Sequence, residues 1–180
     1  MKEISLHLLD VARNSIAAGA GRIDVVLEEN EKHLCRLCVT DDGCGMDPEL
    51  LARAADPFTT TRTTRKVGMG LPLLSMMAEQ TGGRLELESR VGAGTTVTAW
   101  YWADHIDCPP AGDLPGTVAL LIQGAPEVEW TYRHSVPKGT VTLDTRELRR
   151  VLGPEVALSE PEVALWIRDH LREQEEGIKE

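Results

Sequence analysis

The sequence has no long apolar run and no apolar stretch behind its first residues. No window approaches the roughly 18 consecutive apolar residues that a membrane-spanning helix requires. Residues 1–3 are Met, Lys and Glu, and the apolar core of a signal peptide does not follow them. We therefore expect a cytoplasmic protein that makes no contact with a membrane.

Basic residues and cysteines are also few. Lys and Arg number 19 against 29 Asp and Glu, which gives a formal net charge of −10 at pH 7. Because nucleic-acid affinity rests largely on clustered Lys and Arg, we expect no nucleic acid among the partners. The four cysteines fit a reducing compartment. Cys35 and Cys38 have CxxC spacing, but they lie in a predicted strand, where positions three apart face opposite sides, so we expect no shared metal.

Helical periodicity dominates the first 20 residues. Small and apolar residues recur at helical spacing and predict a helix from residue 2 to about residue 19. These residues are Ile4, Leu8, Val11, Ala12, Ser15 and Ile16. Asp10 and Asn14 are four residues apart and share one face, with His7 a further turn back. That polar face is either ordinary exposed helix surface or part of a site.

A glycine-rich turn follows two predicted strands, residues 22–29 and 33–41, whose alternating pattern indicates a sheet buried mainly on one face. The turn reads Asp-Asp-Gly-Cys-Gly-Met from Asp41 to Met46. A carboxylate at a strand end can accept a hydrogen bond from an amine edge. Gly43 and Gly45 can adopt positive φ and let the backbone approach a flat ring. By itself, the motif also fits a plain acidic turn before the short helix that Asp47 and Pro48 begin.

Hydroxyl and cationic side chains fill residues 58–71. Gly68 and Gly70 open a second predicted helix that runs to residue 80 or 81. A helix N-terminus presents unpaired N–H groups and a partial positive charge. With Arg62, Arg65 and Lys66 before it, this start is a suitable phosphate cradle. The alternative is a mobile surface loop before an ordinary helix.

The last predicted hairpin of this part, residues 84–91 and 95–102, turns at residues 92–94 and places Trp100 and Trp102 on the outer face. Residues 104–112 have the composition of a linker. Beyond it the pattern predicts a helix over 113–124, a hairpin over 127–136 and 140–143, and helices over 144–152 and 162–176. We expect residues 104–180 to fold back and cover both tryptophans. The alternative is a docking face that includes them.

Taken in order, four of these segments resemble the motifs of GHKL ATPases, the family of sensor histidine kinases, MutL-type mismatch-repair ATPases, type II topoisomerases and heat-shock chaperones. The segments are residues 9–20, 41–46, 56–60 with 68–71, and 92–96. The resemblance covers residues 1 to about 103. It implies a Bergerat ATP-binding fold of the α+β class: a two-layer sandwich of a mixed, mostly antiparallel sheet with helices on one face. The domain prediction is an ATP-binding domain over 1–103, a linker over 104–112 and a C-terminal α/β extension over 113–180, packed on the first domain.

The resemblance also implies ATP and Mg²⁺ as cofactors and assigns roles around the base. The implied ATP-binding residues are Asn14, Ala18, Asp41, Gly43, Gly45, Met46, Thr59, Gly68, Met69, Gly70, Leu71 and Thr95. Asp41 would accept a hydrogen bond from the adenine 6-amino group, which selects adenine over guanine. The two glycines of the turn and Met46 would line the base, and Thr95 would add a hydroxyl near it.

At the phosphate end, the resemblance makes Asn14 the protein ligand of Mg²⁺, a metal that prefers hard oxygen donors. Residues 68–71 would hold the phosphates. Among Arg62, Arg65 and Lys66, at least one would reach the γ-phosphate, and the sequence does not rank them.

One position departs from the family pattern. Members that hydrolyse ATP carry Glu four residues before the asparagine, as the base that orients water. Here that residue is Asp10, which is one methylene shorter. A carboxylate displaced by about 1 Å can cost ~100-fold in rate, so we expect slow hydrolysis or phosphotransfer. His7 is considered as a hydrogen-bonding neighbour of Asp10 and, less favourably, as a phosphoacceptor.

Three functions remain open at this point. The first is a histidine-kinase-like ATPase or phosphotransferase in signalling or regulation. Because the chain begins at the ATP-binding segment, its phosphoacceptor would lie on another chain. The second is a MutL-like conformational switch driven by ATP with slow hydrolysis, and the third is a non-catalytic ATP-gated binding module. A homodimer is left open as the assembly.

Overall fold

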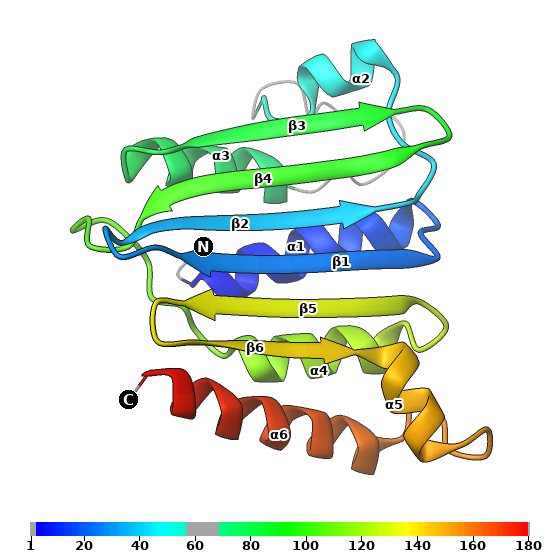
Figure 1. Ribbon diagram of the computed structural model, residues 1–180. Coiled ribbons are helices and arrows are strands. Elements are labelled where there is room, and N and C mark those ends of the chain that lie inside the picture. The colour runs from blue at the N-terminus through cyan, green and yellow to red at the C-terminus, as the bar shows by residue number, and fades with distance from the viewer. Residues whose placement is uncertain (1–2, 57–68, 180) are drawn as a thin grey trace.

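Two layers, a sheet and a set of helices, make up the fold in the computed structural model, which describes residues 3–56 and 69–179 (Figure 1). The helices are α1 (Ile4–Ala17), α2 (Pro48–Arg53), α3 (Gly70–Gln80), α4 (Leu114–Gly124), α5 (Thr145–Leu152) and α6 (Pro161–Lys179). The strands are β1 (Arg22–Glu29), β2 (Leu34–Asp41), β3 (Arg84–Arg90), β4 (Gly94–Trp102), β5 (Glu129–Val136) and β6 (Gly139–Asp144). These ranges agree with the predicted elements to within a few residues.

The six strands form one sheet in the order β3-β4-β2-β1-β5-β6. Every neighbouring pair is antiparallel except β1 and β5, which run parallel. The mixed, mostly antiparallel sheet confirms the predicted α+β class and two-layer architecture.

Buried and partly exposed residues alternate along the strands, which shows that the helices cover one face of the sheet. On β1 and β2, Ile23, Val25, Leu37 and Val39 are buried, whereas the residues between them are partly exposed. Helix α1 packs on β2 and on both α3 and α4, and α6 packs on α4 and β6. Figure 1 shows α1, α3 and α4 behind the sheet, so the apolar core lies between these helices and one sheet face.

The C-terminal segment extends both layers. Strand β5 pairs with β1 and carries β6 with it, while α4 and α6 continue the helix layer beside α1. The segment before α4 also contacts α1, because the N–H groups of Ile4 and Ser5 donate to the carbonyls of Pro110 and Ala111, both at 2.9 Å. These carbonyls satisfy two of the N–H groups that a helix start leaves unpaired.

The other sheet face carries Trp100 and Trp102, as predicted, but residues 104–180 do not cover them. The C-terminal strands join the sheet beyond β1, α4 lies with α1 and α3 behind the opposite face, and α6 packs on α4 and β6. The prediction of a C-terminal cover is therefore wrong. Instead, the Arg84 guanidinium lies over the Trp100 ring at 4.1 Å from its centroid, and Trp102 lies beside Gly82. Neighbours on the β3 side leave both rings half-buried.

Cys35 and Cys38 lie on opposite faces of β2, as their strand position predicts. Burial raises the pKa of the Cys35 thiol to about 12. Across residues 3–56 and 69–179, no group of three or more His, Cys, Asp or Glu side chains is arranged to hold a metal ion. Within the same ranges, no helix combines the length and apolar character needed to cross a bilayer.

Candidate adenine and phosphate site

The glycine turn after β2 is built so that only glycine fits at two of its positions. A Cβ on Gly43 would lie 2.8 Å from the Ala18 Cβ, and one on Gly45 would lie 2.0 Å from the carbonyl oxygen of Arg90. Gly45 also has a φ of 70°, which side chains rarely adopt. The turn is tied to the end of α1, because the N–H of Cys44 donates to the Ala18 carbonyl at 2.9 Å. The turn backbone is therefore packed closely on α1 and on the end of β3.

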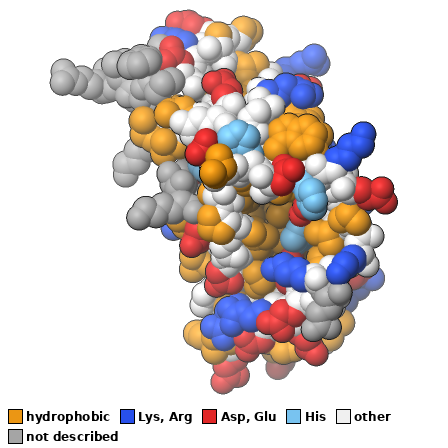
Figure 2. Space-filling model, turned by 90° about the vertical axis from the view of Figure 1, so that its left-hand side faces the viewer, with side chains coloured by type: hydrophobic (Ala, Val, Ile, Leu, Met, Phe, Trp, Pro, Cys, Tyr) orange, Lys and Arg blue, Asp and Glu red, His pale blue; other side chains and the backbone are white. Residues whose placement is uncertain are grey.

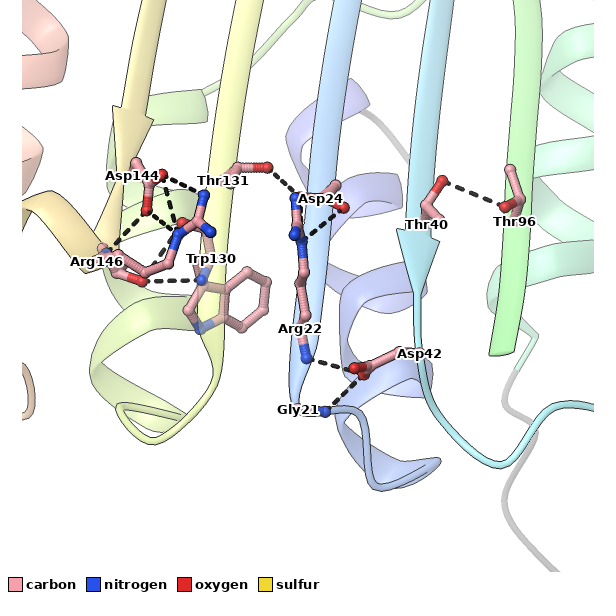
Figure 3. Close-up of polar contacts among 11 residues, drawn as sticks. Gly21, Arg22, Asp24, Thr40, Asp42, Thr96, Trp130, Thr131, Asp144 and Arg146 are labelled. Atoms are coloured by element: carbon pink, nitrogen blue, oxygen red, sulfur yellow. Dashed lines mark hydrogen bonds and ion pairs between the residues drawn. The ribbon is translucent and has the colours of Figure 1, made fainter. Parts of the chain in front are cut away.

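Asp41, the last residue of β2, is held from both sides. Its side chain is buried, at 8% exposed. The Ser15 hydroxyl donates to Oδ2 at 2.6 Å, and the Gly43 N–H donates to Oδ1 at 2.9 Å. Because each carboxylate oxygen can accept more than one hydrogen bond, the group keeps acceptor capacity for a ligand N–H. The neighbouring Asp42 is exposed instead and accepts from the N–H groups of Gly21 and Arg22 at 2.8 and 2.9 Å, as Figure 3 shows.

A row of polar side chains continues from Asp41 across the sheet. Thr95 on β4 is the register partner of Asp41 on one side and of Ser89 on the other. The hydroxyls of Ser89 and Thr95 lie 2.8 Å apart, and the N–H of Met46 donates to the Ser89 hydroxyl at 2.7 Å. Asp41, Met46 and Thr95, which the family resemblance assigned to the base, thus lie together at this end of the sheet.

The polar face of α1 meets the start of α3. A Cβ on Gly70 would lie 2.9 Å from the Asp10 Cβ and 3.5 Å from its Oδ2, so the first turn of α3 begins directly beside this carboxylate. Asn14, one turn along α1, is half-buried like Asp10. Among the described residues its side-chain amide has no hydrogen-bond partner. An amide oxygen in this position is chemically suited to Mg²⁺, which binds few protein oxygens and keeps contacts to phosphates and water.

The hydrogen bond considered between His7 and Asp10 is absent. His7 is 1% exposed, and neither ring nitrogen has a partner within the described part of the chain. It lies on the core side of α1 with Leu8 and Val11, and burial lowers its pKa to about 4. An imidazole enclosed in this way is also not accessible as a phosphoacceptor, so both roles considered for His7 are wrong.

Several predicted site residues fall in the part of the chain that the structure does not describe. These are Thr59, Arg62, Arg65, Lys66 and Gly68. Of the remaining helix-start residues, Leu71 is buried and Met69 is 47% exposed.

Sequence reasoning missed the roles of Ser15 and Ser89. Ser15 was included only in the helical pattern of the first segment, on its buried side, and Ser89 occupies an inward position of the predicted strand 84–91. A hydroxyl in an otherwise apolar stripe requires a hydrogen-bond partner when it is buried. That requirement is the sequence signal that could have identified them.

The opposite end of the sheet is different in character. Figure 2 faces that end and shows histidine side chains beside acidic ones. His33 Nδ1 lies 2.8 Å from Glu29, and His105 lies 3.8 Å from Asp107. The hydrogen bond to Glu29 raises the pKa of His33. These pairs lie near the start of β2 and the end of β4, whereas the candidate site is at the end of β2.

Comparisons with known proteins find similarity to one family of ATPases and to histidine kinases. The profile of the family described as "Histidine kinase-, DNA gyrase B-, and HSP90-like ATPase" matches residues 1–105. The sensor histidine kinase AruS of Pseudomonas aeruginosa is 29% identical over 173 residues, covering 88% of this chain and 17% of the relative. The histidine protein kinase DivJ of Caulobacter vibrioides is 34% identical over 102 residues, covering 54% of this chain and 17% of the relative.

One solved structure extends the comparison to the fold. The N-terminal domain of a DNA repair protein superposes with a TM-score of 0.53 at 16% identity, covering 86% of this chain and 58% of the other. This similarity concerns the fold alone. The chain spans about a sixth of the length of the two kinases, at 17% of each.

Proposed function

This chain belongs to the family of histidine kinase-, DNA gyrase B- and HSP90-like ATPases, and on that basis we propose that it binds MgATP and transfers the γ-phosphate to a partner protein. The observation that carries the proposal is the Asp41 carboxylate, buried at a strand end and oriented by Ser15 and Gly43. A buried carboxylate of this kind is costly unless it is hydrogen-bonded, and its remaining acceptor capacity suits the 6-amino group of adenine.

Around the base, Asp41 accepts from the 6-amino group, Gly43, Gly45 and Met46 lie along the ring, and Thr95 adds its hydroxyl. The close packing of the turn on Ala18 and Arg90 supports this role, because it fixes the backbone that a flat ring would lie against. Ala18, which packs against Gly43, would lie on the same side of the base.

Around the phosphates, Asn14 would hold Mg²⁺, which neutralises phosphate charge when bound. The start of α3, residues 69–71, and the preceding Gly68 supply N–H groups and a partial positive charge. Thr59, Arg62, Arg65 and Lys66 remain the proposed lid contacts. The packing of Gly70 on Asp10 supports the shared location of these groups.

Asp10 is the proposed base that orients the acceptor or water. It lies beside the start of α3, where the γ-phosphate would be, but its side chain is short for this task. We therefore propose slow turnover. A second candidate, the MutL-like switch, is favoured by the same observation, because a carboxylate in this position supports hydrolysis. A non-catalytic ATP-gated binding module is the third.

The remaining parts of the proposal concern organisation. We propose residues 1–103 as the ATP-binding domain, 104–112 as the linker and 113–180 as an extension packed against it, in a cytoplasmic protein. We propose a partner protein as the phosphoacceptor and a homodimer as the assembly.

Thermal unfolding with and without MgATP tests the binding site. We expect wild-type protein to gain several degrees in Tm with millimolar nucleotide, since a ligand that binds only the folded state stabilises it. Asp41→Asn and Asn14→Ala should remove most of the gain. Asp42→Asn is the matched control, because its amide oxygen can still accept from Gly21 and Arg22. A wild-type protein without any shift contradicts the assignment.

Transfer of label from γ-labelled ATP separates the proposed activities. With cell lysate as the source of acceptors, a labelled partner protein supports phosphotransfer, and release of free phosphate alone supports the switch. If the protein binds ATP but yields neither a labelled partner nor free phosphate, the result supports the binding module.

A further inference from the structure

The sheet face opposite the helix layer is left open by the elements that the structure describes. Figure 1 looks onto this face, with α1, α3 and α4 behind the strands. The centre of the open face is apolar. Val26 on β1 is the register partner of Cys38 on β2, and Leu34 on β2 is the register partner of Trp102 on β4. With Trp100, these side chains are only half-buried in a single copy of the chain.

Ion pairs flank this apolar centre and join neighbouring side chains of the open face. The Glu28 carboxylate lies 2.7 Å from the Arg36 guanidinium and 3.7 Å from that of Arg133 on β5. On β3, the Arg84 guanidinium lies 2.8 Å from the Glu86 carboxylate. Aromatic residues and arginine are enriched in protein interfaces, where a polar rim surrounds the buried centre. The open face has this composition.

The charge balance of the open face favours a second copy of this chain as its occupant. Arginines and acidic residues are nearly equal in number at the outward positions of the six strands. The whole chain has a formal net charge of −10 at pH 7. The acidic excess therefore lies mainly on the other surfaces, through which two copies would repel each other. Contact through the open faces avoids most of that repulsion.

The dimensions of the open face are sufficient for a stable dimer. Six neighbouring strands at a spacing of about 4.8 Å make the face roughly 24 Å wide. Strands of 6 to 9 residues make it about 20–30 Å long. Contact over this face covers about 600 Å² on each copy and about 1,200 Å² in total, which reaches the range of specific interfaces.

We propose that two copies of this chain dimerise through their open sheet faces, an inference that gives an interface to the homodimer of the proposed function and rests on it. Two-fold symmetry places the same residues on both sides, and two sheets pack face to face at a separation of about 10 Å. The apolar centres then bury each other, and the ion pairs form the rim. Both adenine sites stay accessible, because Asp41 faces the helix layer and accepts from Ser15 of α1.

A concentration series of the full chain, followed by light scattering and sedimentation, measures the dimer. We expect wild-type protein at micromolar concentration to have twice the mass of the 19.8 kDa chain. Val26→Lys should weaken dimerisation by at least ~100-fold, because an unpaired ammonium group from each copy enters the apolar centre. In a separate copy this side chain points into solvent, between Asp24 and Glu28 of the same strand.

A second variant keeps the test decisive if Val26→Lys does not fold. Trp100→Thr removes a large ring from the apolar centre and keeps a side chain that suits a strand. It should weaken dimerisation by roughly tenfold or more, since buried tryptophans contribute strongly to interfaces.

The matched control is Leu165→Lys. Leu165 on α6 is 50% exposed, and this variant makes the same change of charge on the helix layer. It should leave the dissociation constant of the dimer unchanged. Cys38 adds a local measurement, because dimerisation should slow its alkylation by iodoacetamide relative to the exposed Cys44. Dilution of the wild-type protein should remove this protection.

The possible outcomes separate this inference from the proposed function. Purified wild-type protein that stays monomeric overturns the inference and the homodimer together, and is the result expected if a different protein occupies the face. A dimer that survives both Val26→Lys and Trp100→Thr, or that Leu165→Lys breaks, overturns the inference alone. A dimer that Val26→Lys breaks, but whose Tm does not respond to MgATP, supports the inference and contradicts the proposed ATP site.

Discussion

His7 is the residue with the clearest expected effect of pH. It is enclosed among apolar residues, and burial lowers its pKa from the ordinary 6.5 to about 4. Between these pH values the unfolded chain binds a proton that the folded protein does not. The free energy of unfolding should therefore fall as pH drops from 6.5 to about 4, by roughly 3 kcal/mol from this group.

Replacing His7 by Leu should remove that dependence. Urea unfolding at pH 7 and pH 4.5 measures it, and we expect the variant to lose less stability on acidification than wild type. His33→Leu is the control, because His33 is exposed and bonded to Glu29, which raises its pKa. An equal loss in wild type and His7→Leu would contradict the buried, neutral state.

Replacement by Ala should change the stability of the protein in opposite directions at Gly43 and at Gly177. Ala at position 43 would place its Cβ 2.8 Å from Ala18, so the turn must shift, and overpacking of this kind costs about 1–3 kcal/mol. Position 177, in α6, has nothing within 4 Å of a new Cβ, and Ala there should stabilise the helix by about 0.5 kcal/mol. Urea unfolding of the two variants checks both signs, and a stabilised Gly43→Ala would refute the tight packing.

At this scale the sequence predicted which side chains would gather, but not how they are oriented. The strand end and the glycine turn pointed to Asp41, whereas the grouping of Met46 and Thr95 with it was implied by the family resemblance. The hydroxyls of Ser15 and Ser89 and the inward direction of His7 depend on the helix rotation and strand register that bring distant segments together. Local periodicity does not contain that information.

Among the elements, α6 is anchored by a buried polar cluster. Glu175 is 3% exposed; it accepts from the Tyr132 hydroxyl at 2.8 Å and lies 2.7 Å from His134 Nδ1, both residues of β5. Burial opposes the charged carboxylate, but the hydrogen bond and charge of His134 outweigh it, and the pKa of Glu175 is lowered. The same burial and the nearby carboxylate raise the pKa of Tyr132.

Glu175→Gln should therefore destabilise the protein at pH 7, by about 3 kcal/mol if the pair is broken. A lowered carboxyl pKa stabilises the fold above the ordinary value of 4.5, and this contribution is lost as pH falls through the folded pKa below it. The gap between wild type and variant should narrow below pH 4.5 in urea unfolding. Glu176→Gln, on the exposed side of α6, is the control. A gap independent of pH would exclude the ionised pair.

The elements themselves were largely predictable, since each has its own period and its own turn residues. Asp113 and Asp144, for example, accept from the N–H groups of Gly116 and Arg146 and cap α4 and α5. The parallel pairing of β5 with β1 was not predictable, because it joins strands roughly a hundred residues apart in sequence. That missing pairing is why the cover over Trp100 and Trp102 was assigned wrongly.

At the scale of the whole molecule, strands from both sides of the predicted linker, residues 104–112, belong to one continuous sheet. A protease site inserted at Ile106, which is 95% exposed, should allow cleavage between the two parts without separating them. We expect the β1–β5 ladder and the packing of α1 on α4 to hold the two parts together after cleavage. Size-exclusion chromatography should show one peak containing both fragments. If the two fragments elute separately, the peptide connection, and not the shared sheet, holds the two parts together in the intact chain.

The two hydrogen bonds between residues 110–111 and α1 connect regions that are remote along the chain. Ile4 and Ser5 start the helix that presents Asp10 and Asn14, and their partners Pro110 and Ala111 directly precede α4. A displacement of α4 or of the C-terminal layer must either break these two hydrogen bonds or move α1 as a rigid body. A molecule that binds the last third of the chain could therefore shift the helix that carries Asp10 and Asn14, and hydrogen exchange at the Ile4 and Ser5 amides would report that shift.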